Sequence, residues 1–321
     1  MSHRPPFIVV LLLGVLFSSV WSSAFVAGKI ALQYANPISL LVFRFAAAAA
    51  IILCTSVLAK RARLFDYRLV GHGAALAALN NAIYLGLTFK GLEYISPALT
   101  TLIVSTVPFL TLTFGYLFLK EAISFSQISG ITFGFIGIYL VISQHLISGS
   151  GVGIGLTFLG TASFALGTVY YRRISETYPA PQLNGWQNLF GALFLLPFTS
   201  DIDVMMSSLG NGMFALALVH LTIVVSIGAM LLWFYLIRSI GASQASAFHF
   251  LVPIFGIVQS AIILNDRITM PDVLGILIVS SSLMLVNRPS AITIRKVSTC
   301  WRRVDQTRRL DKKYGAEEPR W

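Results

Sequence analysis

Polar and aromatic residues interrupt otherwise apolar stretches of this 321-residue chain, and these residues are the ones that could do chemistry. Asn80, Asn81 and Tyr84 lie together in one such stretch, and Asn80 and Tyr84 share a helix face because they are four residues apart. Polar groups are costly in hydrocarbon, so these side chains should face the interior of a helix bundle. Amides, hydroxyls and aromatic rings suit the binding of a small amphipathic solute.

Other apolar stretches contribute similar groups, and together they form a predicted substrate cavity. Its members are Trp21, Ser22, Asn80, Asn81, Tyr84, Thr101, Ser105, Trp233, Gln244, Ser246 and His249. Ser and Thr are also enriched at helix–helix contacts in membranes, so packing is the alternative role for each of them.

His249 is the titratable member of this set, and it lies four residues before Pro253. Proline has no N–H, so the carbonyl of His249 loses its usual helical donor and could face the cavity. An ionisable ring at such a position would allow transport to be coupled to protons. A neutral histidine that is hydrogen-bonded to a neighbouring helix is the alternative.

Four further residues are candidates for gating or coupling. Arg44 lies inside an apolar stretch, about two turns from its outer end, where it either reaches outward or pairs with an acid or a substrate carboxylate. Lys29 lies near the outer end of the first stretch, and for both cations we expect a structural or gating role rather than direct binding. Pro108 and Pro253 are candidate hinges.

No motif in the sequence indicates an enzyme. It shows no metal-ligand spacing, no catalytic Ser/His/Asp context and no phosphate-binding loop, so we expect no catalytic residues, metal or cofactor. The glycine-rich run 151–155 resembles a fragment of a dinucleotide motif but joins two apolar stretches, and we interpret it as a flexible connector.

Composition places these residues in a membrane. Hydrophobic residues make up 56% of the chain and charged residues 11%, with a mean hydropathy of +0.80. Soluble domains are about a quarter charged, so the apolar surface must face lipid. The net charge is +11, and nine of the 23 Lys and Arg residues lie in the last 33 residues. This distribution favours binding to an anionic lipid surface over binding to nucleic acid.

Stretches of about 20 apolar residues predict an all-α protein with ten transmembrane helices. The predicted spans are 7–28, 38–59, 69–89, 96–119, 123–145, 152–171, 182–200, 212–237, 240–264 and 272–288. With the N-terminal segment 1–6 inside, 19 of the 23 Lys and Arg residues fall on the inner side, so both termini, including the basic tail 289–321, are expected in the cytoplasm.

The chain contains an internal repeat. A shift of 145 residues places the region 95–144 on 240–289 without gaps, with Pro108 on Pro253 and Glu121 on Asp266. The halves 7–145 and 146–288 would each hold five spans, and an odd number inserts the second half in the opposite orientation. Inverted repeats are typical of secondary transporters that work by alternating access.

Several short motifs resemble the drug/metabolite transporter superfamily in its EamA branch, over residues 7–288. They are Trp21-Ser22-Ser23-Ala24-Phe25 with Lys29, Phe43-Arg44-Phe45, Asn81-Ala82-Ile83-Tyr84, the segment from Ala98 to Pro108, Leu119-Lys120-Glu121 and Gly130. The second half repeats the later motifs, although Asn265-Asp266 stands where the family usually has Gly-Glu.

The resemblance implies a ten-helix carrier with a central cavity that exports amino acids or related metabolites, in a bacterial cytoplasmic (inner) membrane. Substrate identity does not follow from a family. A monomer and a homodimer both stay open, and a channel or solute sensor without active transport is the alternative function.

Overall fold

The computed structural model describes residues 6–60, 64–120, 123–142 and 150–264, together with a few positions between 270 and 285. Within these ranges the regular structure is entirely helical, which confirms the predicted helical class. The last predicted span for the most part, the tail 289–321 and the matched pair Glu121 and Asp266 lie outside the described residues.

The first half forms a series of helices in which two predicted spans are divided into segments. The helices are α1 (Phe7–Ala31), α2 (Pro37–Leu58), α3 (Tyr67–Leu76), the π-helix η1 (Ala77–Leu85), α4 (Gly86–Gly91), α5 (Pro97–Val104), α6 (Val107–Leu119) and α7 (Phe125–Ile142). The consecutive elements α3, η1 and α4 make up the predicted span 69–89, and α5 and α6 make up the span 96–119.

The second half continues in the same manner. Its elements are α8 (Gly151–Ile174), α9 (Ala180–Leu195), the 3₁₀-helix η3 (Leu196–Phe198), α10 (Ile202–Ser208), α11 (Gly212–Val219), the π-helix η4 (His220–Ala229), α12 (Met230–Ile240), α13 (Ala242–Ser246), the 3₁₀-helix η5 (Ala247–Leu251) and α14 (Val252–Leu264). Every predicted span before residue 264 therefore falls on helices, with ends that differ by a few residues and with residues 143–145 outside the described ranges.

Side-chain caps explain where several helices begin. The Asn36 side chain accepts the Ile38 N–H at the start of α2, and Pro37 occupies the first helical position, where its missing N–H costs nothing. Asp66 caps α3, and Asn211 caps α11 by accepting two backbone N–H groups.

Two sequence interpretations are wrong. The run 151–155 is not a flexible connector but the first turns of α8, where Gly153 packs so closely that an added Cβ would lie 2.8 Å from side-chain atoms of Tyr94 and Ile95. Small residues are enriched where membrane helices approach closely, so the glycines indicate contact rather than flexibility. The sequence also did not predict α10, which lies in what we interpreted as a loop between spans.

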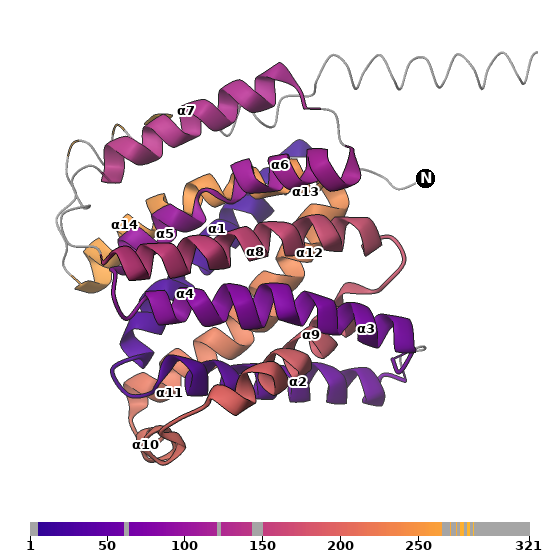
Figure 1. Ribbon diagram of the computed structural model, residues 1–321, viewed down its shortest axis with the longest axis vertical. Helices are drawn as coiled ribbons and strands as arrows, with labels where there is room; N and C mark the ends of the chain where they lie inside the picture. The colour runs from indigo at the N-terminus through magenta and orange to yellow at the C-terminus, as the bar shows by residue number, and fades with distance from the viewer. Residues whose placement is uncertain are drawn as a thin grey trace, which may run out of the picture.

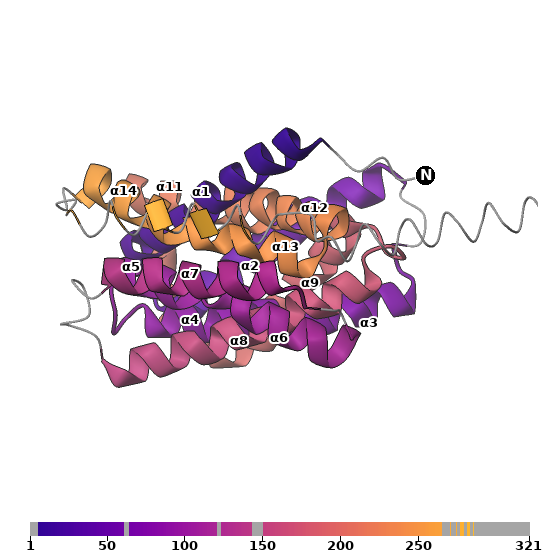
Figure 2. The ribbon, with the colours of Figure 1, turned by 90° about the horizontal axis from the view of Figure 1, so that it is seen from above.

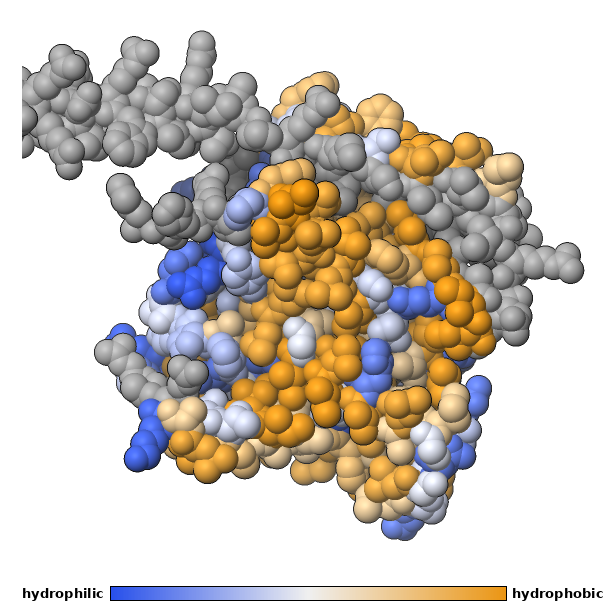
Figure 3. Space-filling view, turned by 180° about the vertical axis from the view of Figure 1, so that it is seen from behind, coloured by the Kyte–Doolittle hydropathy of each residue, from blue (hydrophilic) through white to orange (hydrophobic). Residues whose placement is uncertain are grey.

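Among the described residues, four helices are long and apolar enough to cross a membrane: Phe7–Ala31, Pro37–Leu58, Gly151–Ile174 and the continuous helix Gly212–Ile240. The axes of most helices are roughly aligned with one another (Figures 1 and 2). Large apolar side chains such as Leu12, Phe118 and Leu159 expose more than half of their surface. The face in Figure 3 is mostly hydrophobic, with hydrophilic residues toward its margins, as expected of a surface in contact with lipid.

The interruptions of the helices fall at matching places in the two halves. Shifting η1 by the repeat distance places it on 222–230, which overlaps η4 at His220–Ala229. The break between α5 and α6 falls at residues 105–106, which correspond to 250–251 at the end of η5, and each break is followed by one of the repeated prolines. The repeat seen in the sequence thus extends to the irregular parts of the backbone.

Candidate substrate cavity

A cavity lies between elements of both halves and is lined by sixteen of the described residues. The first half contributes α1, α2, η1 and α4, and the second half contributes α8, α9, η4 and the start of α12. Its polar lining consists of Arg44, Asn80, Asn81, Gln187, Asn188 and Ser226. Its aromatic lining consists of Trp21, Phe25, Phe45, Tyr84, Phe89 and Phe164.

The structure brings some of the predicted site residues together at this cavity and places others elsewhere. Trp21, Asn80, Asn81, Tyr84 and Arg44 line it. The remaining predicted residues do not; they are Ser22, Thr101, Ser105, Trp233, Gln244, Ser246, His249, Lys29, Pro108 and Pro253.

Several of these remaining residues lie at contacts between helices. Ser22 of α1 and Thr101 of α5 both face Gly256 of α14, where an added Cβ would lie 3.3 and 3.2 Å from their hydroxyl oxygens. The Ser246 hydroxyl donates to the carbonyl of Ser243 in its own turn, and Gln244 is half-buried in α13. These positions fit the packing role that was the alternative for Ser and Thr.

A network of carboxamides forms one wall of the cavity. Gln187 Nε2 donates to Asn81 Oδ1 at 2.8 Å, and Asn80 Nδ2 donates to Gln187 Oε1 at 3.4 Å. Asn188 Nδ2 donates to the carbonyl and side-chain oxygens of Asn184, whose own amide reaches the carbonyl of Ser226. Gln187 thus joins α9 to η1 of the first half, and Asn184 separately joins α9 to η4 of the second.

The α9 residues of these hydrogen bonds were not among the residues predicted from the sequence. Asn184, Gln187 and Asn188 are three amides within five residues of one predicted span, at the spacing of a single helix face. This is the same signal that identified Asn80 and Tyr84.

Arg44 is buried in the cavity wall, with 2% of its surface exposed. Its Nε donates to Ser226 Oγ at 2.7 Å, and its guanidinium lies 5.7 and 5.8 Å from the ring centroids of Phe45 and Phe89. Nη1 has no hydrogen-bond partner among the described residues, and none of their ion pairs involves Arg44. The side chain therefore does not reach outward to solvent, and no acid neutralises it in the part of the chain that the structure describes.

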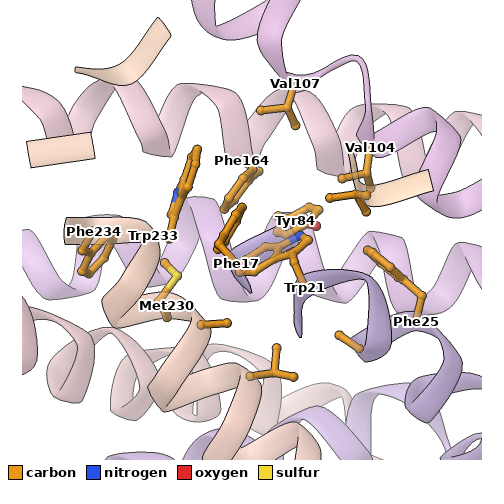
Figure 4. Packing of buried hydrophobic residues seen from close by; sticks show 14 of the residues in the cluster. Phe17, Trp21, Phe25, Tyr84, Val104, Val107, Phe164, Met230, Trp233 and Phe234 are labelled. Carbon is orange, nitrogen blue, oxygen red and sulfur yellow. The ribbon is translucent and has the colours of Figure 1, made fainter. Parts of the chain in front are cut away.

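Aromatic rings packed against one another form another part of the lining (Figure 4). Trp21 and Tyr84 are nearly parallel with centroids 6.4 Å apart, and the centroid of Phe164 lies 4.6 Å from that of Tyr84 and 5.3 Å from that of Trp21. The Trp21 indole N–H and the Tyr84 hydroxyl are buried and form no hydrogen bond of normal geometry with the described residues. The two groups lie close enough to each other to interact, and a solute that binds here would have to replace that contact.

His249 lies behind this aromatic wall and is fully buried. Its ring is surrounded by Phe17, Trp21, Phe164 and Trp233, at centroid distances of 5.3, 5.9, 5.5 and 4.8 Å. Neither ring nitrogen forms a hydrogen bond of normal geometry with a described residue, so the expected alternative, a bond to a neighbouring helix, is not seen.

The carbonyl of His249 is not open to the cavity. Because Pro253 supplies no N–H, this carbonyl accepts the N–H of Val252 in the 3₁₀ turn, and it also accepts the Ser105 hydroxyl at 3.3 Å. The bond from Ser105 joins the break in the first half to the break in the second.

The other gating candidates occupy clear structural positions. Lys29 Nζ donates to the carbonyl of Leu92 at 2.8 Å, at the C-terminal end of α4, so its contact lies within the first half. Pro108 and Pro253 are buried and occupy the second position of α6 and α14, immediately after the two breaks.

Comparison with known proteins agrees with this architecture. The model of the EamA-like transporter family matches the chain twice, at residues 8–143 and 151–288. A solved structure described as "Crystal structure of protein" aligns with a TM-score of 0.65 and 14% identity, over 87% of this chain and 95% of the other, which supports the fold alone.

Similar sequences come from an archaeon and from bacteria. An uncharacterized transporter of Archaeoglobus fulgidus is 28% identical over 83% of this chain and 93% of its own length. The uncharacterized transporter YvbV of Bacillus subtilis is 30% identical over 67% of this chain and 70% of its own, and the uncharacterized inner membrane transporter YedA of Escherichia coli is 28% identical over 77% and 80%. The two family matches cover most of the chain, and it therefore belongs to the EamA-like transporter family.

Proposed function

We propose that this membrane transporter moves a small solute through the cavity by alternating access between two inverted five-helix halves. The observation that supports this most directly is the cavity itself: buried polar groups from both halves converge on one space inside an apolar helix bundle. Buried polar groups in a membrane protein are costly, and they are typical of a transport pathway.

The matching irregular segments support the alternating mechanism. Inverted halves can exchange conformations around one site, which gives outward-open and inward-open states of similar energy. The π-helices η1 and η4 carry cavity residues in both halves, and the breaks before Pro108 and Pro253 lie at matching positions. We infer that these four segments change shape during the cycle, since π-bulges and proline breaks are the usual sites of helix bending.

The resemblance to EamA-type carriers favours export of an amino acid or related metabolite. We place the protein in a bacterial cytoplasmic membrane with both termini in the cytoplasm, because 19 of the 23 Lys and Arg residues would then lie on that side. The named inner membrane relative in Escherichia coli supports the same location.

Counterflow in proteoliposomes tests the carrier mechanism. Vesicles that contain the purified protein and are loaded with a mixture of unlabelled metabolites should transiently accumulate an external radiolabelled metabolite above its equilibrium level, and the initial rate should saturate. A channel would equilibrate the label without the transient, and a solute sensor would show no flux above that of protein-free vesicles.

Replacing His249 tests proton coupling. The ring is enclosed by uncharged aromatic side chains, so it should be neutral in this conformation and bind a proton only when the cavity opens. We expect His249→Phe, which keeps a ring in this packing, to retain at least a third of the exchange rate but to lose the stimulation of export by external acid. The measurement is export from inside-out and right-side-out vesicles at pH 5.5 and 7.5. The same pH dependence in wild type and variant would exclude His249 as the coupling residue.

A further inference from the structure

The charge balance of the cavity identifies a class of solute. Arg44 is a buried cation whose only hydrogen bond among the described residues is to the hydroxyl of Ser226. An uncompensated buried charge costs several kcal/mol, and a guanidinium matches the geometry of a carboxylate. An anionic solute would provide the missing compensation each time it binds.

The hydrogen-bonding groups that are free in the cavity point to the same charge. Arg44 Nη1 and Trp21 Nε1 are buried, can only donate, and have no partner of normal geometry among the described residues, while the Tyr84 hydroxyl can donate or accept. Asn80 Oδ1, a buried acceptor without a partner among the described residues, is neutral and faces Gly167 of α8. No carboxylate of the described residues lines the cavity, so an ammonium group would meet no charged partner among them.

The rest of the lining is apolar and ring-shaped. Trp21 and Tyr84 are stacked, and Phe164 lies tilted against both. Phe45 and Phe89 lie beside the guanidinium of Arg44, and Phe25 also lines the cavity. Such surfaces favour a flat or ring-containing apolar body.

Building on the proposed transport function, we propose that the cavity binds a monoanion with a carboxylate-type head and an apolar ring-sized body, without a requirement for an amino group. The head pairs with Arg44 and accepts from Trp21 Nε1, and the body stacks on Trp21, Tyr84 and Phe164. This narrows the cargo from amino acids and related metabolites to organic acids of this shape.

Binding to the purified protein in detergent tests the proposal with four probes of one shape. Phenylacetate carries the anion alone, phenylglycine is phenylacetate with an added ammonium group, phenethylamine carries the cation alone, and 2-phenylethanol is neutral. Isothermal titration calorimetry should give the highest affinity for phenylacetate, at least tenfold above each of the other three. Equal or tighter binding of phenethylamine or 2-phenylethanol would overturn the proposal, and tighter binding of phenylglycine would return the cargo to amino acids.

Two substitutions should remove this preference by different routes. Arg44→Gln deletes the cation, and Ser226→Asp places a carboxylate against Arg44 Nε in the place of a hydroxyl that lies 2.7 Å from it. We expect each to weaken phenylacetate binding at least tenfold. Ser226→Asn has the bulk of Asp without its charge, so it should weaken phenylacetate binding clearly less than Ser226→Asp does. The control outside the cavity is Lys90→Gln, which removes a cation from an exposed ion pair with Glu93 and should bind phenylacetate as the wild type does.

Thermal stability separates a binding role from a structural one. Since both variants relieve an uncompensated buried charge, Arg44→Gln and Ser226→Asp should melt at or above the wild-type temperature. Lower melting temperatures together with unchanged phenylacetate affinity would show that Arg44 serves packing alone. If phenylacetate binds through Arg44 but no solute shows counterflow, the transport function fails and this inference stands. Counterflow of other solutes without anion binding would overturn the inference alone.

Discussion

Gly160→Val should prevent most of the protein from folding stably, because Gly160 lies where α8 meets the helix that contains η1. A Cβ at Gly160 would lie 2.8 Å from the backbone carbonyl oxygen of Tyr84 and 2.8 Å from Thr88 Oγ1. Backbone atoms cannot rotate away as a side chain can, so the two helices would have to separate. Overpacking of this kind costs about 1–3 kcal/mol in ordinary cores, and close approach of helices is a main source of stability in membranes.

The same displacement should disturb the cavity. Gly153, Gly160 and Gly167 recur every seven residues along α8. A Cβ added to Gly153 would contact Gly91 and Tyr94, one added to Gly160 would contact Tyr84, and one added to Gly167 would contact Asn80. Since Tyr84 and Asn80 line the cavity, moving α8 outward would move both of its walls.

Gly155→Val provides the matched control for this prediction. It makes the same substitution in the same helix, with the same change in helix propensity, but a Cβ at Gly155 would meet nothing within 4 Å. The measurement is the fraction of monodisperse protein on size-exclusion chromatography after a series of heating steps. We expect Gly155→Val to follow the wild type and Gly160→Val to aggregate at a clearly lower temperature. Equal curves for the two variants would show that the contact between α8 and η1 is not a determinant of stability.

The positions of the helices were predictable because hydrocarbon requires long apolar stretches with internally satisfied backbones. The predicted spans 7–28 and 38–59 correspond to α1 at Phe7–Ala31 and α2 at Pro37–Leu58. The short helix α10 has no such requirement, and its Met, Ser and Asp residues showed no apolar stretch of that length. The run 151–155 was predicted to be a connector because glycine is unfavourable in the helices of soluble proteins. In membranes, however, glycine permits close contact between helices, and the run is part of α8.

Part of the site was predictable and part was not, for a physical reason. Asn80, Asn81 and Tyr84 stand out because they are polar groups in an apolar stretch, and they line the cavity. The contact of Arg44 with Ser226 joins residues 182 positions apart, and local sequence spacing carries no information about such a pair. The sequence also could not show which of these residues line the cavity. Trp233 and His249 are polar or aromatic residues in apolar stretches, as Tyr84 is, yet they do not line the cavity and lie behind its aromatic residues.

Gln187→Met should lower both transport and stability, because Gln187 holds together the carboxamide network between the two halves. The substitution keeps an unbranched side chain of similar length but leaves Asn81 Oδ1 without its donor at 2.8 Å and Asn80 Nδ2 without its acceptor. A buried polar group that loses its partner costs about 1–3 kcal/mol. We therefore expect a lower melting temperature, and at least a tenfold fall in the initial rate of counterflow because the wall of the cavity loses its fixed geometry.

A double variant distinguishes the energetic role of the network from its role in transport. Adding Asn81→Leu, which is close to asparagine in shape, removes the acceptor that Gln187→Met leaves unsatisfied. Replacing both partners of a buried hydrogen bond by apolar groups is often nearly neutral, so the double variant should recover much of the lost melting temperature. It should not recover transport, because the polar surface that a solute would contact is then absent. Gln33→Met, at an exposed position, should match the wild type in both measurements. Recovery of both stability and flux in the double variant would show that the amides serve only to pack α9 against η1, and the solute would then have to be bound by Arg44 and the aromatic wall alone.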